Sequence, residues 1–241
     1  MKLFKKVFTF ILNVFLDIFY PKRCIICNCK LNIAKKICIC SDCMPFLKSK
    51  GQAIRDTSKF FEEAVSPLEY EGNTKEWMRE FKFRIKKYLG STFSYAIYQN
   101  IKEREFIKTV SLICPVPIHP SRDREYNQSE VIAKGISNKF SIPLAPDMLL
   151  KISNIKPLSK MDFKLRSRMI KSAIEFNVKY NIEGKIVCLV DDIYTTGSTA
   201  NECARILKMY GAQKVYVLSA CHTPKKETGE NENADTNIAD K

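Results

Sequence analysis

Two adjacent carboxylates and a hydroxyl-rich turn form the densest group of chemically capable residues in the sequence. Asp191 and Asp192 follow the apolar run Ile186–Val190, and the turn begins three positions after the second acid. Its hydroxyl groups surround a single glycine, in the order Thr195, Thr196, Gly197, Ser198 and Thr199. Ala200–Tyr210 then has the apolar spacing of a helix, so the segment reads as strand, acids, turn and helix.

This order of elements suits a phosphorylated sugar. A turn at the N-terminus of a helix points free backbone N–H groups outward at the positive end of the helix dipole, where they can hold a phosphate. The two carboxylates can accept hydrogen bonds from ribose hydroxyls and bind a Mg²⁺ that bridges the sugar to a pyrophosphate. 5-Phosphoribosyl 1-pyrophosphate (PRPP) combines all three groups. The alternative is a strand with solvated acids, followed by a helix that Ser198 or Thr199 merely caps.

The elements that must position these residues belong to an α/β fold. A continuous apolar run such as Ile186–Val190 is typical of a central parallel strand that is covered on both faces. Doubly wound folds bind their ligands beyond the carboxyl ends of such strands. With 241 residues, 45% of them hydrophobic, the chain has room for one such domain and a small additional module. We predict a parallel sheet flanked by helices.

Two CxxC pairs, Cys24–Cys27 and Cys40–Cys43, lie near the start of the chain and are separated by twelve residues. Each pair can direct two thiolates at one tetrahedral ion, and two pairs fill all four positions of a structural zinc site. A closed site leaves no position for an activated water, so the predicted role of the metal is structural. A segment this short cannot build its own core, and the metal supplies folding free energy.

The other cysteines leave alternatives open. A ligand set drawn from Cys27, Cys29, Cys38 and Cys40 is conceivable, although its spacing is poorer, and a redox dithiol is a second alternative. Four further cysteines lie in apolar patterns and are expected to be buried small side chains, namely Cys114, Cys188, Cys203 and Cys221. Clustered cysteines and the lack of a segment that resembles an export signal favour a reduced, cytoplasmic protein.

Residues 1–20 are predicted to form an amphipathic helix, because their polar residues recur about every four positions. Charged side chains near a bilayer centre cost about 2.5–3.5 kcal/mol each, so we expect no transmembrane segment. The helix can pack on its own protein or make a peripheral contact with a membrane or a partner. The formal charge of +14 suits a polyanionic partner, and residues 1–50 carry ten Lys or Arg against two Asp.

The run Val187–Thr199 resembles the PRPP-binding motif of type I phosphoribosyltransferases, with its hydrophobic run, paired acids and TTGST-like loop. The resemblance implies that Asp191 and Asp192 bind the ribose and that Thr195–Thr199 bind the 5′-phosphate. Residues 16–223 as a whole resemble the ComF family of competence-associated, phosphoribosyltransferase-like proteins. Pro21 and the double cysteine knuckle match the front of that family, and Phe81-Lys82-Phe83 resembles the end of its basic helix region.

The segments 114–122 and 124–128 resemble the second signature of the family, whose loop lies over the pyrophosphate in related transferases. Arg122 and Arg124 are therefore implied to neutralise the pyrophosphate by bidentate hydrogen bonds and to act in catalysis with Asp191 and Asp192. His119, which precedes a proline, is more typical of a turn residue than of a catalyst.

Some residues of this sequence differ from the family pattern, and the differences affect the prediction of transferase activity. Glu125 stands where relatives usually have glycine, and of the residues in the third family region only Arg166 and Ala173 remain. The loss weakens the predicted acceptor site more than the PRPP site, and the sequence offers no evident general base. The domain prediction is a helix, a zinc-binding module, a phosphoribosyltransferase-like domain and a disordered tail, at residues 1–20, 21–50, 60–223 and 224–241.

Two functions follow from these features. In the first, the protein binds PRPP with Mg²⁺ and transfers a phosphoribosyl group to an unknown acceptor, in connection with DNA uptake during natural competence. In the second, it is a non-enzymatic binding factor whose basic N-terminal face holds single-stranded DNA or a DNA-translocating helicase. The sequence leaves catalysis open.

Overall fold

The computed structural model describes residues 21–32, 36–49, 52–54, 59–83, 86–118, 126–151 and 174–224. Several predictions lie outside these residues: the amphipathic helix of residues 1–20, the loop that carries Arg122 and Arg124, the third family region with Arg166 and Ala173, and the tail apart from Pro224. Within the described part of the chain, no helix is long and apolar enough to cross a membrane.

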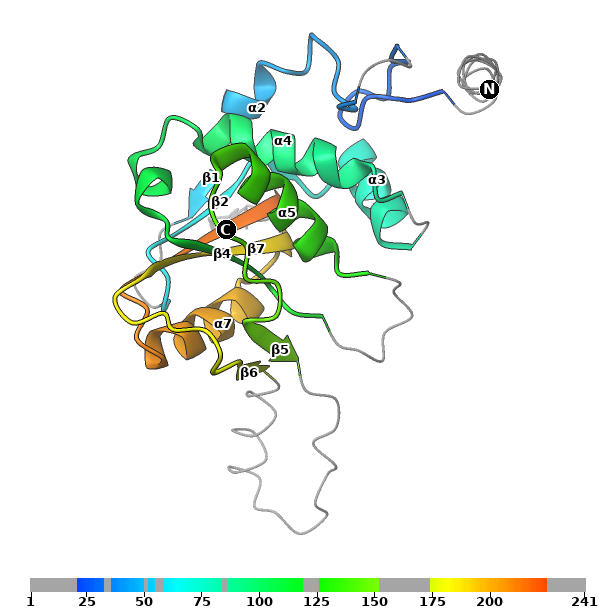
Figure 1. The fold of residues 1–241 in the computed structure, drawn as a ribbon. Helices are drawn as coiled ribbons and strands as arrows, with labels where there is room; N and C mark the ends of the chain where they lie inside the picture. Colours follow the sequence, from blue (N-terminus) through cyan, green and yellow to red (C-terminus); the bar gives the residue numbers. More distant parts are fainter. Residues whose placement is uncertain are drawn as a thin grey trace, which may run out of the picture.

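A six-stranded sheet forms the centre of the molecule (Figure 1). Its strands are ordered β1-β2-β8-β7-β4, and the short β3 also pairs with β8. The strands are β1 (Gln52–Ile54), β2 (Glu63–Ser66), β3 (Leu68–Glu69), β4 (Leu112–Pro115), β7 (Ile186–Tyr194) and β8 (Lys214–His222). All pairs are parallel except β1 with β2. The prediction of a parallel sheet flanked by helices is confirmed.

Helices cover both faces of this sheet, as Figure 1 shows. One face carries α3 (Gly72–Phe83), α4 (Leu89–Ile101) and α5 (Gln128–Phe140), and the other carries α7 (Ser198–Met209). A two-stranded sheet of β5 (Leu149–Lys151) and β6 (Ile174–Phe176) lies beside α7. The remaining elements are α2 (Phe46–Ser49) and the 3-10 helix η1 (Glu105–Thr109).

The central strand β7 explains the apolar run in the sequence. Val187, Cys188, Leu189 and Val190 are all fully buried. Cys188 and Val190 face the core beneath α4 and α5, whereas Val187 and Leu189 face the core beneath α7. Because successive side chains alternate between two covered faces, each of these four positions must be apolar. The four cysteines that were predicted to be buried, at positions 114, 188, 203 and 221, have no exposed surface.

The cysteine-rich segment packs directly on α3 and α4. Ile25, Ile39 and Leu47 are buried in the same core as the α4 residues Phe93 and Ile97. Hydrogen bonds join the two parts, from Cys38 N–H to the Thr92 hydroxyl at 3.0 Å and from the Asn100 amide to the Leu47 carbonyl at 3.0 Å. The segment therefore completes one core with the helices instead of forming a separate one.

Candidate functional site

Strand β7 delivers the paired acids to the carboxyl edge of the sheet. Asp191 lies opposite Ser219 of β8, and the pairing continues to Tyr194 opposite His222. The sequence pattern suggested that the strand ends at the acids, but the strand runs on to Tyr194 because β8 remains alongside it. The acids are thus held by the sheet itself and are only partly exposed.

The two carboxylates have different surroundings. Asp191 Oδ1 accepts hydrogen bonds from the Ser129 hydroxyl at 3.2 Å and from the Asp192 N–H at 2.8 Å. Asp192 Oδ2 pairs with the ammonium of Lys82 at 2.8 Å. Burial and the neighbouring charge of Asp192 raise the pKa of Asp191 to about 7, while its hydrogen bonds and Lys82 act in the opposite direction. The pair is a compact anionic site that already holds one cation.

The turn after β7 has the geometry of a phosphate cradle. Gly197 has a φ of 72°, in the left-handed region, and occupies the N-cap position of α7 without any side-chain cap. Neither Ser198 nor Thr199 therefore caps the helix. The side chains of Thr195, Thr196, Ser198 and Thr199 are exposed, and the Thr196 and Ser198 hydroxyls lie 2.8 Å apart. The first N–H groups of α7 can therefore serve an anion.

A cavity of about 40 Å³ joins Asp191 to the turn, and it is lined by Asp191 and by the run from Ile193 to Ala200. One water occupies roughly 10–15 Å³ on this measure, so the cavity has room for about three water molecules, which suits a group of phosphate size. We call Asp191, Asp192 and the turn Thr195–Thr199 together the acidic edge.

Sequence reasoning missed two residues of this region, Lys82 and Ser129. Lys82 is at the end of α3, and Ser129 is in the first turn of α5. Both reach the acids from helices far away in the chain. The only local signal was the position of Lys82 between Phe81 and Phe83, which puts a charge next to core positions. This signal does not indicate which residue the lysine contacts.

The residues predicted to bind pyrophosphate, together with the neighbouring histidine, lie outside the described residues: His119, Arg122 and Arg124. The described residues on both sides of that gap contact β7. Val116 N–H donates to the Val190 carbonyl at 2.8 Å, and Ser129 contacts Asp191. Asn127 accepts from the Ser129 N–H at 3.0 Å as the N-cap of α5 and donates to the Val116 carbonyl at 3.0 Å. The segment that carries the arginines therefore begins and ends next to the acidic edge.

The four predicted zinc ligands come together. The Sγ atoms of Cys24, Cys27, Cys40 and Cys43 all lie within 4.8 Å of one another, and we call these residues the cysteine group. Tetrahedral zinc with bonds of roughly 2.3 Å requires sulfurs about 3.8 Å apart, and Cys27 Sγ lies 3.7 Å from Cys40 Sγ. Hydrogen bonds from Cys29, through its backbone and its thiol, lower the pKa of Cys27 to about 6. The group can hold a structural metal.

Cys29 and Cys38 are not part of this group. Cys29 is exposed, whereas Cys38 is buried against α4 and burial raises the pKa of its thiol. The alternative ligand set would require a thiolate at a position where the protein disfavours the charge.

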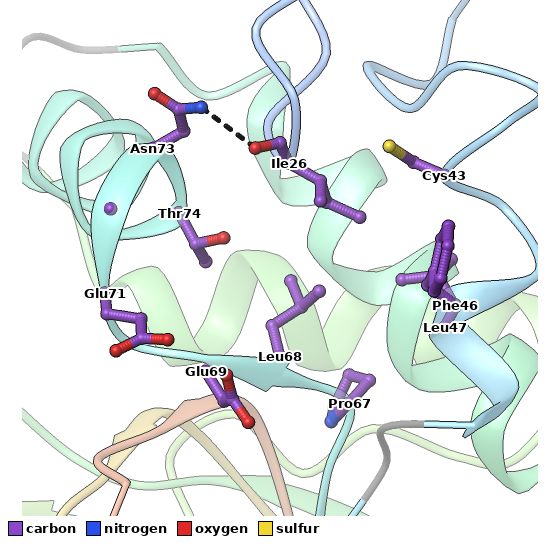
Figure 2. A pocket seen from close by; sticks show the side chains of 11 residues that line it. Ile26, Cys43, Phe46, Leu47, Pro67, Leu68, Glu69, Glu71, Asn73 and Thr74 are labelled. Carbon is purple, nitrogen blue, oxygen red and sulfur yellow. Dashed lines mark hydrogen bonds between the residues drawn. The ribbon is translucent and has the colours of Figure 1, made fainter.

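A larger cavity, of about 430 Å³, lies between the cysteine-rich segment and the start of α3 (Figure 2). Ile26, Phe46 and Leu68 contribute apolar surface, and the Asn73 amide closes one side by donating to the Ile26 carbonyl at 2.9 Å. No residue of the acidic edge lines it. We place the functional site at the smaller cavity, because there Asp191 meets the exposed hydroxyls of the turn and the N-terminus of α7, in the order of strand, acid, turn and helix that the sequence predicted. The larger cavity is also lined by acids, Glu69 and Glu71, and by the start of α3, but these do not belong to that unit.

One buried base also lies at this end of the sheet. His222 ends β8 opposite Tyr194 and is 1% exposed, and within the described residues its ring nitrogens have no hydrogen-bond partner. Burial lowers the pKa of the imidazole, so it is neutral at neutral pH. The sequence had offered no evident base, because a histidine next to a strand end has no distinctive pattern.

The fold and the acidic edge define a phosphoribosyltransferase-like domain, and comparison with protein families agrees. The family described as "Phosphoribosyl transferase domain" matches residues 126–239, a range that contains α5, β7, the turn, α7 and β8. The central strand-turn-helix unit therefore lies within the matched domain.

The chain is also similar to curated proteins that are named for competence or DNA utilization. Competence protein F of Haemophilus influenzae is 26% identical over 221 residues, covering 83% of this chain and 96% of the relative. Competence protein ComFC of Bacillus subtilis is 29% identical over 205 residues, covering 77% and 78%. DNA utilization protein YhgH of Salmonella typhimurium is 22% identical over 208 residues, covering 82% and 90%. Together with the matched domain, these similarities support a ComF-family, phosphoribosyltransferase-like protein.

Proposed function

We propose that this ComF-family chain binds PRPP together with Mg²⁺ at the acidic edge. The observation that carries the proposal is that one strand-turn-helix unit supplies two adjacent carboxylates and a turn of exposed hydroxyls, with Asp191 and the turn lining the same small cavity. A sugar that carries a 5′-phosphate on one side and free hydroxyls on the other matches this arrangement of donors and acceptors.

Each part of the ligand has a counterpart in the chain. Ribose hydroxyls donate to Asp191 and Asp192, and the 5′-phosphate accepts from the N–H groups and hydroxyls of Thr195–Thr199. The carboxylates fit Mg²⁺, which prefers oxygen ligands and, when bound, neutralises charge on the pyrophosphate. Arg122 and Arg124 belong to the proposal as pyrophosphate ligands, because their segment begins and ends next to the acidic edge.

Isothermal titration calorimetry tests this proposal. We expect PRPP with Mg²⁺ to bind the wild-type chain and Asp191→Asn/Asp192→Asn to lose at least roughly a hundredfold in affinity, because two hydrogen-bond acceptors for charged or hydroxyl groups are altered. Glu62→Gln/Glu105→Gln is the matched control, since it removes two carboxylates far from the site. Unchanged affinity in the acidic double variant would show that these carboxylates are structural.

Phosphoribosyl transfer is the enzymatic form of the proposal. The acceptor's nucleophilic atom would form a bond to C1 of the ribose as the bond from C1 to pyrophosphate breaks, and the acceptor's proton would pass to solvent. Arg122 and Arg124 would hold the departing pyrophosphate, and Mg²⁺ held by Asp191 and Asp192 would supply further positive charge. Pyrophosphate release in the presence of purine, pyrimidine and amine acceptors measures it directly. If none of these acceptors causes pyrophosphate release while PRPP still binds, the result would argue against transferase activity and for a binding role alone.

A role in DNA uptake is the second part of the proposal. It is supported by relatives named for competence and DNA utilization and by the basic excess of residues 1–50. In this role the cytoplasmic chain, with a structural Zn²⁺ in the cysteine group, contacts single-stranded DNA or a DNA-translocating helicase. Binding of a single-stranded oligonucleotide should weaken steeply as salt rises, and binding that salt does not change would argue against a nucleic-acid contact.

A further inference from the structure

Lys82 holds the acidic pair in the structure. Its ammonium lies 2.8 Å from Asp192 Oδ2, and only 14% of the Lys82 side chain and 13% of the Asp192 side chain are exposed. A second carboxylate, Asp191, is adjacent, and Lys82 lowers its pKa against the larger effect of burial. Within the described residues, Lys82 thus supplies the cation that offsets these two partly buried carboxylates.

The end of α3 is fixed by contacts that do not involve this ammonium. The Tyr126 hydroxyl donates to the Phe81 carbonyl, and the Gln128 amide donates to the Lys82 carbonyl at 3.4 Å. The rings of Phe81 and Tyr126 also pack with their centroids 5.7 Å apart. The backbone of Lys82 is therefore held in place, while its four-carbon stem is free to carry the ammonium to another position.

Occupation of the site creates a conflict at Asp192. The proposed ligand brings Mg²⁺ and ribose hydroxyls to the carboxylates, and two cations compete for the same oxygens. The same ligand brings a pyrophosphate, which the bridging Mg²⁺ keeps close to the carboxylates. An ammonium that leaves Asp192 therefore finds a strong anionic acceptor within reach of a lysine stem.

We propose that Lys82 is a displaceable counter-ion, which holds Asp192 in the empty site and moves its ammonium to the pyrophosphate when PRPP binds. This inference rests on the proposed function. It gives Lys82 a role in ligand specificity: PRPP regains a contact with the displaced ammonium, whereas ribose 5-phosphate, which lacks the pyrophosphate, must break the ion pair without compensation.

The test compares two ligands on the same full-length protein. Affinities for PRPP and for ribose 5-phosphate, both with Mg²⁺, are measured by calorimetry for the wild type and for Lys82→Met, which keeps the apolar stem and removes the charge. We expect Lys82→Met to lower the affinity for PRPP by roughly tenfold to a hundredfold, which is the value of a charge-assisted hydrogen bond. The affinity for ribose 5-phosphate should stay unchanged or increase. Lys75→Met, an exposed lysine of the same helix, is the matched control and should change neither affinity.

Two further features keep the result interpretable. The ratio of the two affinities comes from the same protein sample, so a partly unfolded variant does not alter it. Lys82→Arg retains a cation and should keep PRPP binding within a few-fold of the wild type, because a guanidinium also binds phosphates.

Each other outcome overturns a definite statement. Equal weakening of both ligands would make Lys82 a structural counter-ion that only shapes the carboxylates. Unchanged affinities for both ligands would show that Lys82 takes no part in ligand binding. A wild-type chain that does not bind PRPP would overturn the proposed function and this inference together, whereas binding without the ligand preference would overturn this inference alone.

Discussion

The acidic edge and the cysteine group are both polar clusters on short segments, but different forces hold them in place. The acids sit on β7, which pairs in parallel with β4 on one side and with β8 on the other. The cysteine group lies on irregular backbone that is joined by few hydrogen bonds, such as Cys24 N–H to the Cys29 carbonyl and Ile25 N–H to the Cys38 carbonyl, each at 2.9 Å. The sheet preforms one site, whereas we expect the other to depend on a bound metal.

From this contrast we expect different consequences when a metal is removed from the cysteine group and when PRPP is removed from the acidic edge. Without a metal, four thiols that lie within 4.8 Å of one another lose what joins them, and nearby buried residues such as Ile25 and Ile39 lose their support. Without PRPP, the acidic edge keeps its strand, its hydrogen bonds and its counter-ion. Three substitutions test the contrast, in order of decreasing expected effect.

Cys27→Ser/Cys40→Ser should have the largest effect. We expect bound zinc to fall from one ion per chain to none and the free energy of unfolding to fall by several kcal/mol, because half of the ligand set is lost. Elemental analysis and chemical denaturation measure the two quantities. Cys29→Ser, a neighbouring exposed thiol outside the group, should keep both at the wild-type value. Loss of zinc in Cys29→Ser would return the alternative ligand set to consideration, because only that set contains Cys29. Zinc retained by the double variant would contradict both sets, since each contains Cys27 and Cys40.

Gly197→Ala should have an intermediate effect on the acidic edge. The glycine has a φ of 72°, and an added Cβ would collide with the Tyr194 hydroxyl. We expect a loss of about 2–3 kcal/mol in the free energy of unfolding, together with weaker PRPP binding, because strain and collision add.

Gly184→Ala is the matched control for that substitution. Gly184 has a φ of 67°, but nothing lies within 4 Å of its added Cβ, so only the backbone strain of about 1 kcal/mol should remain. Equal costs for the two glycines would mean that the turn yields to the extra carbon and is less rigid than proposed.

Asp191→Asn should have the smallest effect on stability, and a favourable one. The pKa of Asp191 is raised to about 7 from an ordinary value of 3.8, so between these values the folded chain binds more protons than the unfolded chain. The stability contributed by this group is present at low pH and is lost as pH rises through 7. The variant should therefore exceed the wild type by about 1–2 kcal/mol at pH 8 and by less at pH 5.

Urea denaturation at the two pH values checks this expectation. Asp192→Asn is the comparison, because it removes the partner of Lys82 and should instead destabilise the protein. A stability gain for Asp191→Asn that does not depend on pH would contradict the role of its ionisation. A gain in stability joined to a loss of PRPP binding would show that the acid is kept for function.

The sequence predicted the elements of the acidic edge well because their signals are local. The apolar run of β7 and the helical spacing of α7 each lie within a dozen residues, and the hydroxyl-rich turn between them shows as a break in both patterns. The strand end was misplaced, since only the pairing with β8 extends β7 past the acids. The roles of Arg122 and Arg124 stay predictions, as do the amphipathic helix of residues 1–20 and the disordered tail.

By itself, the sequence determined the parallel α/β core, the order of paired acids, hydroxyl-rich turn and helix, and the two CxxC pairs as a candidate metal group, because spacing along the chain decides each of them. Only the tertiary structure decided that Lys82 pairs with Asp192, that Ser129 contacts Asp191 and that His222 is buried opposite Tyr194. These residues lie up to 110 positions from their partners. Contacts over such separations depend on how helices pack against the sheet, and no local pattern records that packing.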